Sequence, residues 1–156
     1  RAFVRGFERR FWQGSPDHRG VPEAPGRVVT LIAIEGAVCG GCAYRIDPAE
    51  ADAVLEALDM REQAGFSRHM LPLHSSAPSA HGAASPVFAE GLTWIANADN
   101  AHFLGPLPEE EIANVIRTRH GPSGANTEYV LRLRESLREL EIVDPHVEKI
   151  SVYLAS

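Results

Sequence analysis

The sequence predicts an α+β domain in which strands precede helices without strict alternation. Two observations support this fold class. Runs of β-branched and small apolar residues gather toward the start of the chain, and apolar residues spaced three and four apart gather toward its end. The chain has 156 residues, of which 44% are apolar, enough to bury one sizeable core. We therefore expect a single domain over residues 1–156.

The charge balance narrows the classes of partner. The chain has 15 Lys and Arg residues against 21 Asp and Glu residues, for a net charge of -6. This is the wrong sign for a protein that holds nucleic acid by neutralising phosphates, so no nucleic-acid partner is expected. No apolar run approaches the roughly 18 residues of a membrane span. Two cysteines make no disulfide framework, and no secretory signal is visible, so we expect a cytoplasmic protein without a membrane partner. The oligomeric state stays open.

The first element is a strand, predicted from about Ala2 to Gln13. Alternation along an extended chain places Phe3, Phe7 and Phe11 on one face, with arginine stems beside them. The next stretch, Gly14–Gly26, holds three glycines and three prolines, which interrupt both helices and central strands. It is predicted to be a structured loop.

The following apolar runs predict more strands. Val28–Ile34 and Val38–Ile46 flank Glu35-Gly36-Ala37, a sequence suited to a turn, so the two runs are predicted to form a hairpin. Further strands are predicted at Phe66–His74 and Val87–Ala96.

Capping residues and periodicity predict the helices. Asp47-Pro48-Ala49-Glu50 offers an N-cap acceptor, a proline at the first helical position and a capping-box glutamate, so a helix should begin there. A second helix should begin at Glu109, where acidic residues complement the helix dipole. Longer and shorter helices are predicted at Asn126–Leu140 and Pro145–Tyr153.

Two clusters contain residue types that can bind metals, but the sequence around each cluster argues against a metal site. Cys39-Gly40-Gly41-Cys42 is a C-x-x-C motif, but it lies in a strand-like run and has no second ligand pair, which favours buried core cysteines over a redox or zinc site. His69, His74 and His81 are interpreted as surface or loop histidines. The last of them falls in the small-residue loop predicted for Ser75–Ser85. No metal site is expected.

A glutamate near the end of the first predicted helix is the main chemical candidate. Glu62 precedes Gly65, where the helical pattern stops. A carboxyl group can act as general acid or base when it is partly desolvated. The alternative is a solvated glutamate paired with Arg61 or Arg68.

Several short segments form a recognisable pattern along the chain. They are Arg9–Ser15, Asp17–Pro22, Pro25–Leu31, Ala43–Arg45, Leu58–Gly65, Asp99–Asn100, Leu104–Pro106, Gly121–Gly124 and Asn126–Tyr129. In this order they resemble the ChaC family of glutathione-specific gamma-glutamylcyclotransferases, over about residues 7 to 140. The resemblance implies a gamma-glutamylcyclotransferase-like small mixed β-barrel with flanking helices. It also implies a lyase that converts glutathione to 5-oxoproline and cysteinylglycine without a metal or organic cofactor.

The resemblance also assigns roles to residues. It implies that Glu62, in the family's Arg-Glu-x-x-Gly-aromatic motif, is the catalytic base and then the acid. The candidate substrate-binding residues are Gln13, Ser15, Asp17, Arg19 and Tyr129. Those of the loop either line the pocket or hold the loop by hydrogen bonds. Tyr129 either approaches the substrate or packs its ring in the core.

The sequence departs from the family pattern in two ways. Gly40 and Phe66 stand where tryptophan and tyrosine are common, which we interpret as packing changes, and the second departure concerns the substrate loop. The sequence has no Tyr-Gly-Ser-Leu stretch, so the N-terminal strand and substrate loop of the family are expected to be missing from this chain. Two alternatives therefore remain beside the glutathione enzyme. One is a cyclotransferase for another γ-glutamyl compound, with Ser75–Ser85 as a lid that selects it. The other is a non-catalytic module that binds a small anionic metabolite or a protein.

Overall fold

The computed structural model describes residues 1–76 and 85–156. Most of the loop predicted for Ser75–Ser85, including His81, therefore lies outside the described residues. The strands are β1 (Ala2–Ser15), β2 (Gly26–Gly41), β3 (Phe66–His74), β4 (Val87–Ala96), β5 (His120–Gly121) and β6 (Gly124–Ala125). The helices are α1 (Ala51–Arg61), α2 (Glu109–Arg117), α3 (Asn126–Glu139) and α4 (Pro145–Ala155). The α+β class and the predictions for β1, β3, β4, α2, α3 and α4 are confirmed to within a few residues.

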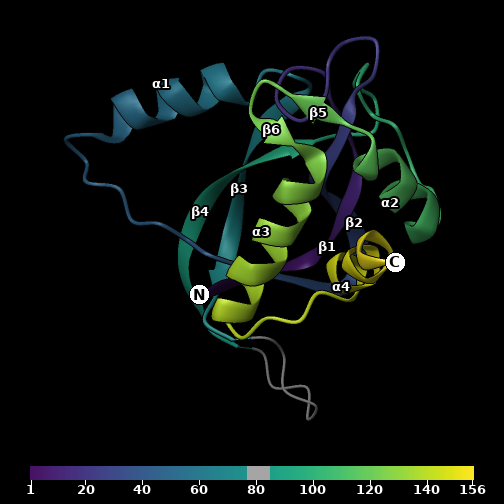
Figure 1. Ribbon diagram of the computed structural model, residues 1–156. Coiled ribbons are helices and arrows are strands. Elements are labelled where there is room, and N and C mark those ends of the chain that lie inside the picture. The colour runs from purple at the N-terminus through teal and green to yellow at the C-terminus, as the bar shows by residue number, and fades with distance from the viewer. Residues whose placement is uncertain (77–84) are drawn as a thin grey trace.

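The core lies between the β1–β2 pair and the three C-terminal helices. Figure 1 shows α2, α3 and α4 gathered beside these strands, whereas α1 stands away from them. The buried cluster contains Phe11, Ile112, Ala113, Ile116, Val130, Leu137, Ile142, Val147 and Ile150. Its helical members recur at spacings of three, four and seven, which places them on one face of each helix. No helix in the described part of the chain has both the length and the apolar character needed to cross a membrane.

The β-barrel expectation is wrong for the described strands. Strands β1 to β4 form an open antiparallel sheet in the order β2-β1-β3-β4, and β5 pairs separately with β6. In the larger sheet, β1 and β3 pair at one position, Phe3 with His74. The edge strands β2 and β4 meet through a side chain: the Thr30 hydroxyl donates to the Ala96 carbonyl and accepts from the Ala96 N–H, both at 3.0 Å. This hydroxyl takes the place of a backbone ladder between the two edges.

The predicted hairpin around Gly36 is also wrong. The first run and the start of the second, as far as Gly41, form one strand, β2, which pairs with β1 along most of its length. Between the pairs Arg5–Val38 and Phe7–Ala33, β2 carries more residues than β1, so the glycine serves a bulge. A turn and a bulge can both place a glycine such as Gly36 at positive φ. The local sequence therefore does not distinguish them, and the pairing with β1 does.

Three smaller expectations need correction. Helix α1 begins at Ala51, one turn later than predicted, because Asp47 caps a preceding turn by accepting from the Ala49 N–H at 2.9 Å. Cys42 is exposed, since β2 ends before it, and Cys39 alone is buried as expected. His74 is buried rather than on the surface, because it pairs with β1 and its Nδ1 lies 2.9 Å from the Ser85 carbonyl.

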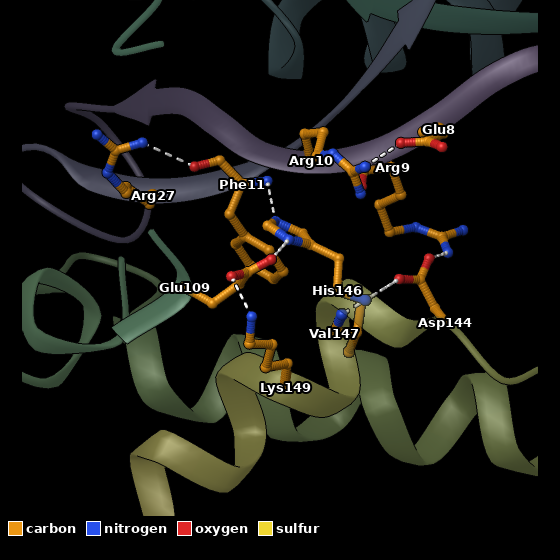
Figure 2. Close-up of polar contacts among 10 residues, drawn as sticks. All are labelled: Glu8, Arg9, Arg10, Phe11, Arg27, Glu109, Asp144, His146, Val147 and Lys149. Carbon is orange, nitrogen blue, oxygen red and sulfur yellow. Dashed lines mark hydrogen bonds and ion pairs between the residues drawn. The ribbon is translucent and has the colours of Figure 1, made fainter. Parts of the chain in front are cut away.

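A buried histidine connects α4 to β1 (Figure 2). The backbone N–H of Phe11 donates to Nε2 of His146 at 3.2 Å, so this nitrogen carries no proton and Nδ1 donates to Glu109 at 3.3 Å. Lys149 contacts the same carboxylate at 2.9 Å. Burial lowers the pKa of His146 from its ordinary 6.5, which agrees with a neutral ring.

We expect Asn126→Ala to lower the free energy of unfolding by about 2–3 kcal/mol. The fully buried amide accepts from the Arg27 N–H at 2.7 Å and donates to the Arg27 carbonyl at 2.9 Å, and alanine leaves both backbone groups unpaired. Urea denaturation measures the change. The exposed Asn114, replaced in the same way, should shift the free energy by less than about 0.5 kcal/mol; equal losses would contradict the prediction.

Stability should also fall as the pH drops below about 6.5, because the unfolded chain protonates His146 before the folded chain does. This contribution is complete above the unfolded pKa and is lost as the pH falls through the lowered folded pKa. In His146→Gln the slope in that window should be shallower, as measured by denaturation at a series of pH values. The exposed His120→Gln is the control, and an unchanged slope in His146→Gln would refute the assignment.

Candidate active site

A cavity of about 660 Å³ collects most of the sequence-predicted site residues. The β1–β2 loop, the end of α1, β2, β4, the β5–β6 turn and α3 all contribute to its wall. The lining residues are Gly14, Ser15, Asp17, His18, Arg19, Val28, Val29, Arg61, Glu62, Ala64, Phe66, Trp94, Ser123 and Tyr129. The structure therefore brings together Glu62, Tyr129 and three of the four predicted loop residues. Gln13 is not among the described residues that line the cavity.

Glu62 occupies the C-cap position of α1. Its backbone N–H donates to the Leu58 carbonyl at 2.8 Å, and the helix stops there. The side chain is 26% exposed and lies 3.5 Å from the Arg61 guanidinium. Arg68, the other partner considered for this glutamate, instead donates to Asp59 at 2.7 Å. A partly buried carboxylate at a cavity wall can exchange protons with a bound molecule.

The β1–β2 loop forms another part of the wall and satisfies much of its own backbone. The Ser15 hydroxyl accepts from the Arg19 N–H at 3.1 Å and donates to Asp17 at 3.4 Å. The Arg19 guanidinium is 15% exposed and lies 3.2 Å from both Glu128 and the Ala125 carbonyl. Ser15, Asp17 and Arg19 thus line the cavity and also hold the loop by hydrogen bonds, so the two predicted roles are compatible.

Tyr129 also satisfies both of its interpretations. Its ring packs edge-on against Phe11 of the core at 6.1 Å and lies under the Arg19 guanidinium at 5.6 Å. Its hydroxyl accepts from the Val29 N–H at 3.4 Å, which leaves the phenolic hydrogen free to donate. Burial raises the pKa of this phenol, so it stays protonated near neutral pH.

Two residues of the site were missed by sequence reasoning. His18 lies with Nε2 3.3 Å from the Arg61 carbonyl and Nδ1 3.2 Å from the Ser123 hydroxyl, which connects three parts of the wall. Trp94 forms another part, and its indole N–H donates to Asp59 of α1 at 3.0 Å. The tryptophan gave no local signal, because its contact depends on the pairing of β3 with β4. His18 lies in the Asp17–Pro22 segment of the family pattern, and that position was the available signal.

Gln13 serves the site from outside the cavity. It is fully buried, and its amide nitrogen donates to the Ala64 carbonyl at 2.7 Å. The same amide group pairs with that of Asn100, at 3.1 and 3.3 Å. Ala64 lies two residues after Glu62, so this network joins β1 to the turn that follows the glutamate.

A second cavity, of about 720 Å³, lies where β1 meets the start of α4. Arg9 contacts Asp144 at 2.6 Å and Arg10 contacts Glu8 (Figure 2). Asp144 also caps α4 by accepting from the N–H groups of His146 and Val147, both at 3.1 Å. These carboxylates are committed to neighbours, so the cavity at Glu62 is the better candidate for proton transfer.

Comparisons with known proteins agree with this geometry. A family model described as ChaC-like protein matches residues 1–155. The chain is 40% identical over 154 residues to gamma-glutamylcyclotransferase 2-3 of Arabidopsis thaliana, covering 96% of this chain and 75% of that protein. It is 34% identical over 181 residues to the glutathione-specific gamma-glutamylcyclotransferase of Saccharomyces cerevisiae, covering 91% and 78%. A crystal structure of the yeast gamma-glutamylcyclotransferase specific to glutathione matches with a TM-score of 0.84 and 30% identity, over 99% of this chain and 86% of that one.

Gly65→Ala should destabilise the protein more than Gly36→Ala. Both glycines have positive φ, 88° and 76°, which costs an alanine about 1–2 kcal/mol. A Cβ at Gly65 would lie 2.3 Å from the Asn100 Oδ1, whereas at Gly36 no described atom lies within 4 Å. Thermal or urea unfolding of both variants measures the difference. Equal losses would mean that the Asn100 contact yields without cost.

Proposed function

The chain belongs to the ChaC family, and we propose that its 660 Å³ cavity cleaves the γ-glutamyl bond of glutathione, within one domain over residues 1–156. The observation that carries the proposal is that Glu62 and Tyr129, far apart in the sequence, open on one cavity. The relatives named as glutathione-specific cyclotransferases cover nearly the whole chain and support this reaction class.

The size and charges of the cavity suit a tripeptide. Pockets for small ligands usually span about 300–1,000 Å³, and this one lies within that range. Arg19 and Arg61 provide cations for the two carboxylates of glutathione, and Asp17 and Glu62 provide anions for its amine. Such a wall carries charges of both signs, as a zwitterionic γ-glutamyl group does.

The proposed reaction is an intramolecular acyl transfer. The α-amine of the γ-glutamyl group attacks its own γ-carbonyl carbon and forms the ring C–N bond, and the bond from that carbon to the cysteinyl nitrogen breaks. A folded, bound conformer brings amine and carbonyl together and so supplies much of the rate. The products are 5-oxoproline and cysteinylglycine, and the reaction requires no metal or organic cofactor.

Glu62 moves the proton in this proposal. The amine is protonated and inert at neutral pH, so the carboxylate first takes one proton from it and later gives this proton to the departing cysteinyl nitrogen. The ring nitrogen loses its second proton as the lactam forms, and the cysteinylglycine amine takes it up and leaves as an ammonium group. The γ-carbonyl oxygen gains negative charge as the ring closes. The protonated Tyr129 hydroxyl and the Arg19 guanidinium are the donors of the described wall that we assign to binding and polarising the substrate.

The chain should release 5-oxoproline from glutathione, and Glu62→Gln should lose this activity by about 100- to 10,000-fold, since the amide cannot take up the proton. Chromatographic measurement of 5-oxoproline checks both proteins. Glu56→Gln, on an exposed position of the same helix, is the matched control and should keep full activity.

A γ-glutamyl amino acid, incubated in parallel, tests the choice of substrate. We expect 5-oxoproline from glutathione alone. Release only from the γ-glutamyl amino acid would replace glutathione as the substrate, and no release from either would leave a binding module as the function.

A further inference from the structure

Helix α1 does not hold Glu62 in place through its own packing. None of its described side chains is buried; Val54, Leu55 and Leu58 are half-buried, and the remaining positions are mostly exposed. Figure 1 shows the helix standing off from the other elements. A helix without a buried face gains little stability from tertiary contact. Polar contacts from Arg68 and Trp94 to Asp59 hold α1 against β3 and β4. Beyond these contacts, the position of the glutamate at the end of α1 depends on the turn that enters β3.

That turn is held by a pair of amides from two distant segments. Gln13, fully buried at the end of β1, donates to the Ala64 carbonyl. Asn100, in the connection between β4 and α2, donates from Nδ2 to the Gln13 side-chain Oε1 at 3.1 Å, and its Oδ1 accepts from the Gln13 Nε2 at 3.3 Å. Each amide thus uses both its donor and its acceptor, and the pair orients the Gln13 donor toward Ala64.

Asn100 also contacts the turn directly. Its side chain fills the space beside Gly65, where a Cβ would approach its Oδ1 to 2.3 Å. The same oxygen accepts from the His102 N–H at 2.8 Å, which orients the amide. Asn100 itself is not among the described residues that line the cavity, so it does not contact a molecule bound there.

We propose that Asn100 is a positioning residue for Glu62, acting through Gln13 and the Ala64–Gly65 turn. This inference rests on the proposed function only for its effect on the reaction, because the placement of the turn can be measured without substrate. Without the Asn100 amide, Gln13 keeps its bond to Ala64 but loses both bonds to Asn100. The turn, and the Glu62 carboxylate before it, can then move relative to Tyr129. A carboxylate displaced by about 1 Å costs on the order of 100-fold in rate.

The first test measures the turn itself. Hydrogen exchange of wild type and Asn100→Leu should show faster exchange at the N–H groups of Glu62 and Gly65 in the variant, by about tenfold or more, with core protection in α3 retained. Asn97→Leu is the matched control, because it makes the same substitution at an exposed position of the same connection. Unchanged exchange in Asn100→Leu overturns the inference, whether or not the protein cleaves glutathione.

The second test measures the reaction. Asn100→Leu should lower kcat on the order of 100-fold and change KM for glutathione less than about threefold, because the substrate-contacting side chains remain. A raised KM with an unchanged kcat would indicate a role in substrate binding and would overturn the positioning role. An inactive wild type instead contradicts the proposed function, and the exchange result then decides the inference alone.

A double-mutant cycle separates the amide pair from a general loss of stability. Gln13→Met and Asn100→Leu should each lower kcat, and the double variant should fall no further than the worse single variant. Should Asn100→Leu fail to fold, Asn100→Asp is the substitute, since it keeps the acceptor for His102 but cannot donate to Gln13. Strictly additive losses would contradict action through Gln13.

Discussion

The fully buried side chain of Asn126 fixes the relation between the helices and the sheet. Its amide satisfies both backbone groups of Arg27, and its own backbone N–H donates to the Arg119 carbonyl at 3.0 Å. The approach is so close that a Cβ on Gly26 would lie 2.8 Å from the Asn126 side chain. The first residue of α3 is thereby joined to the start of strand β2. Tyr129 lies about one turn further along α3, so the contacts of Asn126 also fix where Tyr129 lines the cavity.

The two walls of the cavity are supported in different ways. The wall made by Tyr129 and the β1–β2 loop continues into the hydrophobic core, since the tyrosine ring packs on Phe11. The wall that carries Glu62 has no such apolar backing from α1. It depends on directional hydrogen bonds, from Gln13 to Ala64, between His18 and Arg61, and from Arg68 and Trp94 to Asp59. Hydrogen bonds fix geometry more narrowly than apolar contact does, which suits a group that must meet a substrate atom within hydrogen-bonding distance.

The charged residues follow a similar division. At the start of α4, arginines and carboxylates are paired with one another or with helix N–H groups, and they stabilise the junction with β1. At the Glu62 cavity, Arg19 pairs with Glu128 and Arg61 lies 3.5 Å from Glu62, yet charges of both signs still line the cavity. A zwitterionic substrate can replace water around such charges without leaving one unpaired, and this is the electrostatic basis of the γ-glutamyl assignment.

The sequence by itself determined most elements and the identity of the candidate glutamate. Strands β3 and β4 and helices α2 to α4 follow from periodicity and capping, which act within a few residues, and the ordered motifs around Glu62 and Tyr129 indicated the family. The tertiary structure decided what depends on a partner distant in the chain. It made Gly36 part of a bulge because β1 lies beside it, joined the edge strands β2 and β4 through the Thr30 side chain instead of a backbone ladder, and placed Gln13 behind the cavity because Ala64 and Asn100 meet it there. These outcomes depend on which groups remain to be satisfied when distant segments meet, and local sequence does not contain that information.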